Sequence, residues 1–416
     1  MKKNELAING GKPVRDSWLS LPYPGAQLYD EQEARKAFEA CMSKSPFRYY
    51  GIHYLGMVEK FEKDLAARMH VKNALAVTSG TAAVVVALKA AGIGPGDKVI
   101  VPSITFVATA GAVICAGAVP VFADVDDTMH IDPKKLEHVV DKYTKAIITV
   151  PLAGAPCQID EIMAFAKAHN LMVIEDVAQS MGSAYQGRAM GTWGDLGTYS
   201  LQMNKILTTG EGGAVVTNND ALYERAVRYH DQGQLRMDPS RSADPALTFP
   251  GQNYRMSEIT GAVANAQLDR LDFIISGMKK TKKILKEELK DIQGLTFRRI
   301  IDEEGDVGAS LIMYAPDNQK ALEFIKAMNA ENIGFYQLYG GKPVYMNPQI
   351  FTKNTVEGKG FPYNQFDEEI VYTEDMCPTA CDLAARMVML SLSPVFTEQD
   401  IEDVIQAVKK VSSAIF

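Results

Sequence analysis

Residues 146–180, AIITVPLAGAPCQIDEIMAFAKAHNLMVIEDVAQS, decide the fold class that we expect. Ala146–Leu152 and Leu171–Asp176 are apolar runs, and each predicts a buried strand. Between them, Ile159–His169 has the apolar spacing of a helix. Strands that are apolar throughout and alternate with helices are typical of a parallel sheet covered by helices on both faces.

The same alternation extends in both directions from this unit. Upstream, the pattern predicts strands at Asn73–Val77, Lys98–Pro102 and Val119–Asp126, and helices at Thr81–Ala91, Ala108–Ala116 and Lys134–Val140. Downstream, two further strands are expected at Gly194–Leu201 and Gly213–Thr217. The expected fold class is therefore α/β, with three αβα layers and a mainly parallel sheet.

The pattern changes after Asn219. We expect a helix at Ala221–His230, a long polar loop at Gly233–Gly251, and one long or two stacked helices over Ser257–Leu289. The last part predicts strands at Leu295–Ile300 and Ala309–Tyr314, helices at Gln319–Asn329 and Glu398–Ser412, and an irregular stretch at Tyr336–Asn364. These expectations divide the chain into a large domain with the N-terminal segment, residues 1–289, and a smaller α+β domain, residues 290–416.

Composition excludes several classes of function. The chain has 416 residues, 43 basic against 51 acidic side chains and a net charge of −8, and no strongly basic block that would favour nucleic acid. The longest apolar stretch, Ala108–Ala123, contains Pro120 and is too short for a membrane span. The N-terminal MKKNELAINGGKPVR lacks the apolar core of a signal peptide. We expect a cytoplasmic protein with no metal site.

Three features on the expected sheet point to a phosphorylated cofactor. Ser79, Gly80 and Thr81 lie where a strand passes into a helix, and a helix N-terminus with hydroxyls beside it binds phosphate well. Asp176 ends an apolar strand, where a carboxylate needs a cationic partner such as a protonated pyridine nitrogen. Lys205 lies beside a glycine-dense turn and could form a Schiff base. Taken singly, they could equally be an ordinary helix cap, a capping aspartate and a solvated loop lysine.

Together, in this order on one sheet, the three features are the parts of a pyridoxal phosphate site. Here the sequence resembles the DegT/DnrJ/EryC1/StrS family of sugar aminotransferases, which have the fold-type I aspartate aminotransferase fold. The resemblance covers nearly the whole chain and is strongest from Ala74 to Leu271. It is carried by TSGTAA (78–83), VPSITFVATAGAVICAGAVPVFADVD (101–126), VIEDVAQSMGS (173–183), GDLGTYSLQMNKILTTGEGGAVVTNN (194–219) and GQNYRMSEITGAVANAQL (251–268).

The resemblance implies pyridoxal 5'-phosphate as the cofactor and two catalytic residues. Lys205 would hold the cofactor as a Schiff base and then transfer protons, and Asp176 would keep the pyridine nitrogen protonated. The other implied cofactor-binding residues are Ser79, Gly80, Thr81 and Ser200 around the phosphate, Phe106 on the ring face, Gln179 near the 3-hydroxyl and Asn253 at the phosphate of the neighbouring subunit. The role of Asn253 implies a homodimer with shared active sites.

The implied reaction moves an amino group from glutamate or glutamine to a keto-sugar. The segment FRRIIDEEGDVGAS (297–310) resembles the branch that makes 8-amino-octulosonate, whereas LAINGGKPVR (6–15) resembles inosose and aminoshikimate-type members. The acceptor therefore stays open among a nucleotide-linked ketosugar, 8-keto-octulosonate and an inosose. Two alternatives are a dehydratase or aromatising enzyme of the same family and a non-catalytic, cofactor-binding regulatory protein. Lys205 favours transamination, because the dehydratase branch has histidine in its place.

Two departures from the family pattern concern the substrate side. Many members have His-Leu-Tyr-Gly where this chain has Pro151-Leu152-Ala153-Gly154, which we expect to reshape the substrate pocket. Many members also have histidine where Gln179 stands, although glutamine is common in inositol-type members.

Overall fold

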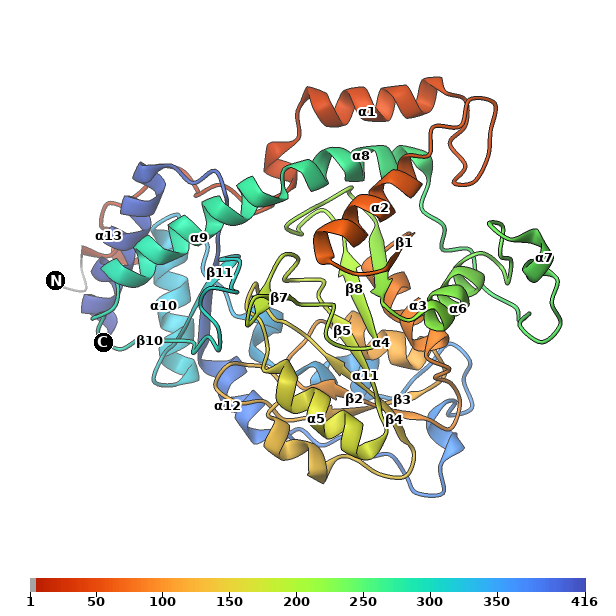
Figure 1. Ribbon diagram of the computed structural model, residues 1–416. Helices are drawn as coiled ribbons and strands as arrows, with labels where there is room; N and C mark the ends of the chain where they lie inside the picture. The colour runs from red at the N-terminus through yellow and green to blue at the C-terminus, as the bar shows by residue number, and fades with distance from the viewer. Residues whose placement is uncertain (1–4) are drawn as a thin grey trace.

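The computed structural model describes residues 5–416, which fold around a central sheet of seven strands (Figure 1). The strands lie in the order β1 (Asn73–Val77), β9 (Gly213–Thr217), β8 (Leu196–Ser200), β5 (Met172–Asp176), β4 (Thr144–Thr149), β2 (Lys98–Pro102) and β3 (Val119–Ala123). β9 is antiparallel to both of its neighbours, and the other six strands run in one direction. The expected α/β class with a mainly parallel sheet is confirmed.

The antiparallel strand follows from its connection. Residues 201–212 join β8 to β9 directly, and a chain that returns without a crossover must run back antiparallel. Ser200 at the end of β8 and Val77 at the end of β1 both pair with Gly213. The carboxyl ends of β1 and β8 therefore lie side by side at one edge of the sheet, with the β8–β9 loop above them.

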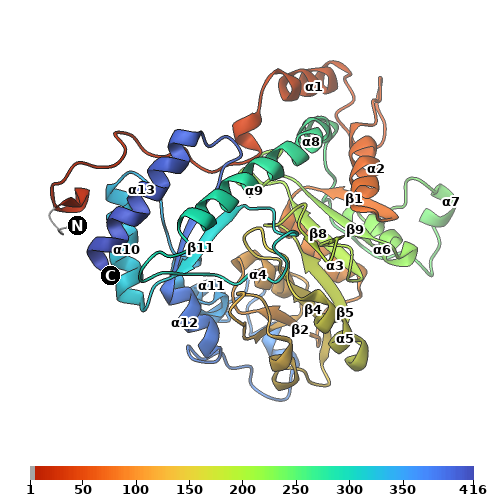
Figure 2. The same cartoon turned by 60° about the vertical axis from the view of Figure 1, so that its left-hand side comes forward.

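Helices cover both faces of this sheet (Figures 1 and 2). One face packs against α2 (Met57–Met69), α5 (Ile159–His169) and α8 (Glu258–Asp269), and the other against α3 (Gly80–Ala90), α4 (Val107–Cys115) and α6 (Asp220–His230). Successive residues of a strand point to opposite faces, so Leu75 and Val77 join one core and Ala74 and Ala76 the other. Because both faces are buried, the strands need the continuous apolar runs that the sequence shows.

A second, antiparallel sheet lies beside the first. Its strands are β10 (Thr296–Phe297), β11 (Ser310–Tyr314) and β12 (Met387–Ser391), with β11 in the middle. It shares a core with α10 (Asn318–Ala330), α13 (Glu398–Ile415) and the end of α9 (Leu271–Glu288). The helical stretch expected at Ser257–Leu289 is thus two helices, α8 and α9, which meet at Arg270.

The core contacts cross the domain boundary expected at residue 290. Leu6 and Leu19 of the N-terminal segment pack with the core of the second sheet. Tyr345, Tyr372 and Leu383, from the C-terminal part, pack with the core of the large sheet. Segments from each side of residue 290 thus contribute to the core that lies on the other side of the boundary. The division at 289/290 stays a prediction.

Several elements differ from the sequence expectation. Residues expected as a helix at Lys134–Val140 form the 3₁₀ helix η4 (Pro133–His138), and only two residues of the strand expected at Leu295–Ile300 form β10. The irregular Tyr336–Asn364 contains short helices: η5 (Leu338–Gly341), η6 (Val344–Met346), α11 (Pro348–Phe351) and η7 (Tyr363–Gln365). Elements without a sequence prediction are η2 (Ala7–Asn9), η3 (Ala26–Leu28), α1 (Glu31–Met42), α2, α12 (Pro378–Arg386), β12 and the hairpin of β6 (Ala184–Tyr185) and β7 (Arg188–Ala189). Over residues 5–416, none of the helices combines the length and apolar character needed to cross a bilayer.

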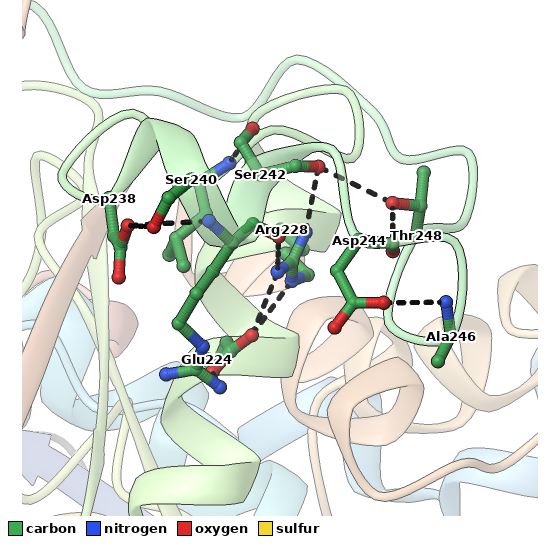
Figure 3. A network of polar contacts seen from close by, with 10 residues as sticks. Glu224, Arg228, Asp238, Ser240, Ser242, Asp244, Ala246 and Thr248 are labelled. Atoms are coloured by element: carbon green, nitrogen blue, oxygen red, sulfur yellow. Dashed lines mark hydrogen bonds and ion pairs between the residues drawn. The ribbon is translucent and has the colours of Figure 1, made fainter.

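The expected long loop at Gly233–Gly251 contains one short helix, α7 (Pro239–Ser242), and is held by a buried arginine (Figure 3). Arg228 on α6 donates from Nη2 to the Arg241 carbonyl at 2.6 Å and from Nη1 to the Ser242 carbonyl at 3.3 Å. Its charge is paired with Glu224 at 2.9 Å. The Arg228 side chain thus donates hydrogen bonds to loop carbonyl groups that no neighbouring strand satisfies. These bonds fix the segment that leads to Asn253.

Candidate active site

Eight of the nine predicted site residues surround one cavity at the carboxyl edge of the large sheet. The cavity measures about 250 Å³ and lies where β1, β5 and β8 end. The sequence-predicted residues that line it are Ser79, Gly80, Thr81, Phe106, Asp176, Gln179, Ser200 and Lys205. They come from four separate segments, and the parallel arrangement of the strands brings them together.

The N-terminus of α3 forms one end of the cavity. The Ser79 hydroxyl caps this helix by accepting a hydrogen bond from the Ala82 N–H at 3.1 Å. The other N–H groups of the first turn have no acceptor within a helix, so they can serve an anion. A Cβ at Gly80 would lie 2.6 Å from the Ser200 Cβ and 2.9 Å from its Oγ. Only glycine lets the helix start come this close to the Ser200 hydroxyl.

Asp176 forms the floor of the cavity at the end of β5. Its side chain is buried, and Oδ2 accepts a hydrogen bond from the Thr109 hydroxyl at 2.9 Å. Burial raises the pKa of Asp176, and the Thr109 hydrogen bond and the charge of Lys205 oppose this rise. Within residues 5–416, no cation forms an ion pair with Asp176. The carboxylate therefore lacks the direct counter-charge that a buried acid needs.

Lys205 enters the same cavity from the loop between β8 and β9. Its N–H donates to the Gln202 carbonyl at 3.0 Å, and its carbonyl accepts from the Gly25 N–H at 3.4 Å, so the backbone is held from both sides. Burial lowers the pKa of the Lys205 amine, and the charge of Asp176 opposes this shift. A lowered pKa gives a larger share of neutral, nucleophilic amine near neutral pH.

Phe106 and Gln179 close the remaining sides. Phe106 precedes α4, and half of its surface is exposed although it is a large aromatic residue, so a ring face is accessible. The Gln179 Nε2 donates to the Tyr339 hydroxyl at 2.6 Å. Tyr339 belongs to η5, and the sequence prediction missed it. The only sequence signal was the Tyr- and Gly-rich stretch at 336–364.

A second cavity of about 460 Å³ adjoins the first. Both cavities are lined by Phe106, Gln179, Gln202 and Lys205. The outer cavity adds hydroxyl and amide side chains from the second sheet and from the loops: Asn204, Ser310, Tyr336, Tyr339 and Ser391. Ala153, from the segment that departs from the family pattern, also lines it. Lys205 therefore borders both this larger space and the first cavity.

Asn253 is not brought to this site within one chain. It is exposed, its backbone bridges to Asp231, and its Oδ1 accepts from the Arg255 N–H at 3.4 Å. It lines neither of the two cavities. The role expected for it in a neighbouring subunit stays a prediction.

Glu175, beside Asp176, is buried on the opposite face of β5. Its carboxylate accepts hydrogen bonds from the backbone N–H groups of Gly191 (2.6 Å), Trp193 (2.7 Å) and Gly194 (2.8 Å). Burial raises the pKa of Glu175 to about 7, and these hydrogen bonds oppose the rise. Glu175 thereby anchors the turn before β8 and fixes the strand end that carries Asp176.

The fold and the site define the class of the protein. The chain resembles the solved structure of an aminotransferase from Psychrobacter cryohalolentis, with a TM-score of 0.80 and 29% identity over 96% of this chain and 99% of the other. The likeness places it among the α/β aminotransferases. More narrowly, the chain belongs to the DegT/DnrJ/EryC1/StrS aminotransferase family, whose model matches residues 30–409.

Two curated relatives show the range of the likeness. The chain is 41% identical over 236 residues to a GDP-perosamine synthase of Escherichia coli O157:H7, a match that covers 56% of this chain and 64% of that enzyme. It therefore spans less than two thirds of that relative. It is also 30% identical to an L-glutamine:2-deoxy-scyllo-inosose aminotransferase of Micromonospora echinospora, over 98% of this chain and 97% of the relative.

Proposed function

We propose that this protein is a pyridoxal phosphate-dependent aminotransferase that moves an amino group from glutamate or glutamine to a keto-sugar. One observation carries the proposal: Lys205, Asp176 and the N-terminus of α3 line the same cavity. The family and both named relatives support it, since one relative is named a GDP-perosamine synthase and the other is named for amino transfer to an inosose. The comparisons favour neither a dehydratase nor a regulatory protein.

The residues present fit this cofactor in three respects. The helix N-terminus with Thr81 and Ser200 suits a phosphate, and a Cβ at Gly80 would fill the cradle. The buried Asp176 lacks a paired cation, which a protonated pyridine nitrogen would supply. Lys205 has the lowered pKa of a Schiff-base lysine. When bound, the cofactor supplies an electron sink for cleavage of a C–H bond.

The chain's own residues would then divide the work. Lys205 would hold the cofactor through its amine, and the freed amine would serve as the base and acid that moves a proton. Asp176 would accept a hydrogen bond from the ring nitrogen and keep it protonated, and Phe106 would pack on a ring face. Ser79, Gly80, Thr81 and Ser200 would bind the phosphate, and Gln179 would lie near the 3-hydroxyl.

The outer cavity suits a polyhydroxylated acceptor. Its amide and hydroxyl side chains can each donate or accept hydrogen bonds, as sugar hydroxyls require. Its volume, about 460 Å³, is in the usual range for a small-molecule site. The acceptor is to be found by offering 2-deoxy-scyllo-inosose, a GDP-linked keto-hexose and 8-keto-octulosonate to the protein charged with an amino group.

A homodimer with shared sites, in the cytoplasm, is part of the proposal. Exposed apolar side chains lie on α1 and on the loop before α2, at Phe38, Met42, Tyr50, Ile52 and Leu55, and a second copy would cover them. Mixing the inactive variants Lys205→Ala and Asn253→Ala should restore part of the activity, because a mixed dimer has one intact site. No recovery after proven subunit exchange would exclude this geometry.

The central test is spectroscopic. The protein with pyridoxal phosphate should absorb in the visible, and Lys205→Ala should lose this band, whereas Lys145→Ala, an exposed lysine outside the cavity, should keep it. Glutamate or glutamine should shift the band of the wild-type protein and leave its amino group on the cofactor. A band that survives in Lys205→Ala contradicts the assignment of the lysine. A band that no amino acid shifts contradicts the aminotransferase proposal itself.

A further inference from the structure

Tyr339 lies at the junction of the two cavities. It lines the outer cavity, and its hydroxyl accepts the 2.6 Å hydrogen bond from Gln179, which lines both. Its ring centroid is 6.1 Å from that of Phe106, at an interplanar angle of 41°. The Tyr339 side chain therefore contacts two of the four residues that line both cavities.

The backbone at Tyr339 is in a conformation that favours glycine. Tyr339 has φ 54° and ψ 28°, and Gly340 and Gly341 follow with φ of 69° and 71°. A tyrosine in the left-handed region is strained, and such strain persists only where the surroundings hold it. Packing of η5 against α12 and β12 provides this support. Because glycine would fit here without strain, the backbone conformation does not account for a tyrosine at this position. We therefore look to its side chain for the reason.

The hydrogen-bond pattern leaves one donor facing the outer cavity. Because the Tyr339 oxygen accepts from Gln179, its own O–H proton is free to be donated elsewhere. No acceptor for that proton is in place among residues 5–416. Burial raises the pKa of Tyr339, so the hydroxyl keeps its proton throughout the neutral range. Gln179 retains a second N–H, which can face the cofactor.

From this geometry we propose that Tyr339 is the residue that recognises a hydroxyl oxygen of the amino acceptor. The inference rests on the proposed function and names a specificity-determining residue of that same site. The amino donor does not need this contact, because glutamate and glutamine carry no alcohol hydroxyl for Tyr339 to recognise. Tyr339 should therefore affect the second half-reaction and spare the first.

The test compares the two half-reactions in Tyr339→Phe, with 2-deoxy-scyllo-inosose and a GDP-linked keto-hexose as acceptors. The variant keeps the ring contact with Phe106 and loses only the hydroxyl. The acceptor KM should rise about tenfold, the effect of one lost hydrogen bond, whereas the visible band and the donor half-reaction should stay within about twofold of wild type. Tyr345→Phe is the matched control, since Tyr345 is a buried tyrosine whose hydroxyl donates to the Glu374 carbonyl at 3.1 Å, away from both cavities.

Deoxy analogues of the accepted keto-sugar provide a second test, and its first measurement uses only the wild-type protein. With the wild-type protein, the KM for one analogue should be about tenfold higher than for the parent keto-sugar, and Tyr339→Phe should not raise the KM for that analogue further. Three results would each overturn the inference and leave the proposed aminotransferase function standing. They are an unchanged acceptor KM in Tyr339→Phe, an equal loss of activity in both half-reactions, and a wild-type KM that is the same for every deoxy analogue. A wild-type protein that aminates no keto-sugar overturns both.

Discussion

Gly80→Ala tests the phosphate cradle with a single methyl group. The added Cβ would lie 2.6 Å from the Ser200 Cβ, about 0.8 Å closer than the 3.4 Å at which ordinary contact begins. Gly80 has no left-handed backbone, so the substitution adds this contact and no backbone strain. Overpacking of this kind costs about 1–3 kcal/mol. Because relief requires α3 to move away from β8, we expect the Kd for pyridoxal phosphate to rise roughly 5- to 150-fold.

The assay is a titration of the cofactor-free protein, followed by visible absorbance, with thermal unfolding of the free and loaded forms. Gly111→Ala is the control, since a Cβ at this glycine of α4 meets nothing within 4 Å. It should stabilise the protein by about 0.5–1 kcal/mol and leave cofactor affinity unchanged. In a Ser200→Gly background, only the 3.2 Å contact with the Cα of residue 200 remains, so Gly80→Ala should cost less than in the wild-type background. Wild-type affinity and stability in Gly80→Ala would refute the cradle.

Two further predictions concern buried titratable groups. Since burial raises the pKa of Asp176 above 3.8, the folded chain binds this proton more tightly than the unfolded one, so ionisation at neutral pH costs stability. Asp176→Asn should therefore make the cofactor-free protein more stable at pH 7, as measured by urea unfolding. The transamination rate of this variant should fall on the order of 100-fold. A variant less stable than wild type would contradict the reasoning. Burial, together with the charge of Arg298, holds the pKa of His130 well below 6.5, so the unfolded chain takes up this proton first and stability is lost as the pH falls below 6.5. His130→Gln should remove up to about 1.4 kcal/mol of that loss per pH unit, and equal acid sensitivity of variant and wild type would refute the assignment.

The sequence predicts the strands of the large sheet well, because each strand and each intervening helix has a local signal. The strands of a two-sided parallel sheet are continuous apolar runs, such as Met172–Asp176, and the helices between them have their own period. The direction of β9 could not be predicted from its residues, since an apolar run is the same in both directions. Helix α1 was not predicted, although Asp30 and Glu33 form a capping box at its start. Strand β12 was not predicted because its sequence, MVMLS, has one β-branched residue and is as compatible with a helix as with a strand.

The candidate site likewise has one part that the sequence predicts and one part that it does not. The cofactor end consists of short contiguous segments, each at the carboxyl end of a strand, so sequence order alone predicts that they meet. The acceptor end depends on contacts between distant parts of the chain. Gln179 and Tyr339 are 160 positions apart, and their hydrogen bond requires the left-handed turn at Gly340 and Gly341. Asn253 points to a further limit, because its expected role depends on a second copy of the chain.

Charge balance in the cavity explains how an acidic protein can be built for an anionic cofactor. The net charge of −8 belongs mostly to the surface, where water and salt screen it. Inside, burial shifts Asp176 toward its neutral form and Lys205 toward its neutral form, and each group opposes the shift of the other through space. A bound pyridine cation would satisfy Asp176, and a phosphate would satisfy the N–H groups of α3. The cavity thus has backbone donors at one end and an acid at the other, which is the order in which the proposed cofactor would present its phosphate and its ring nitrogen.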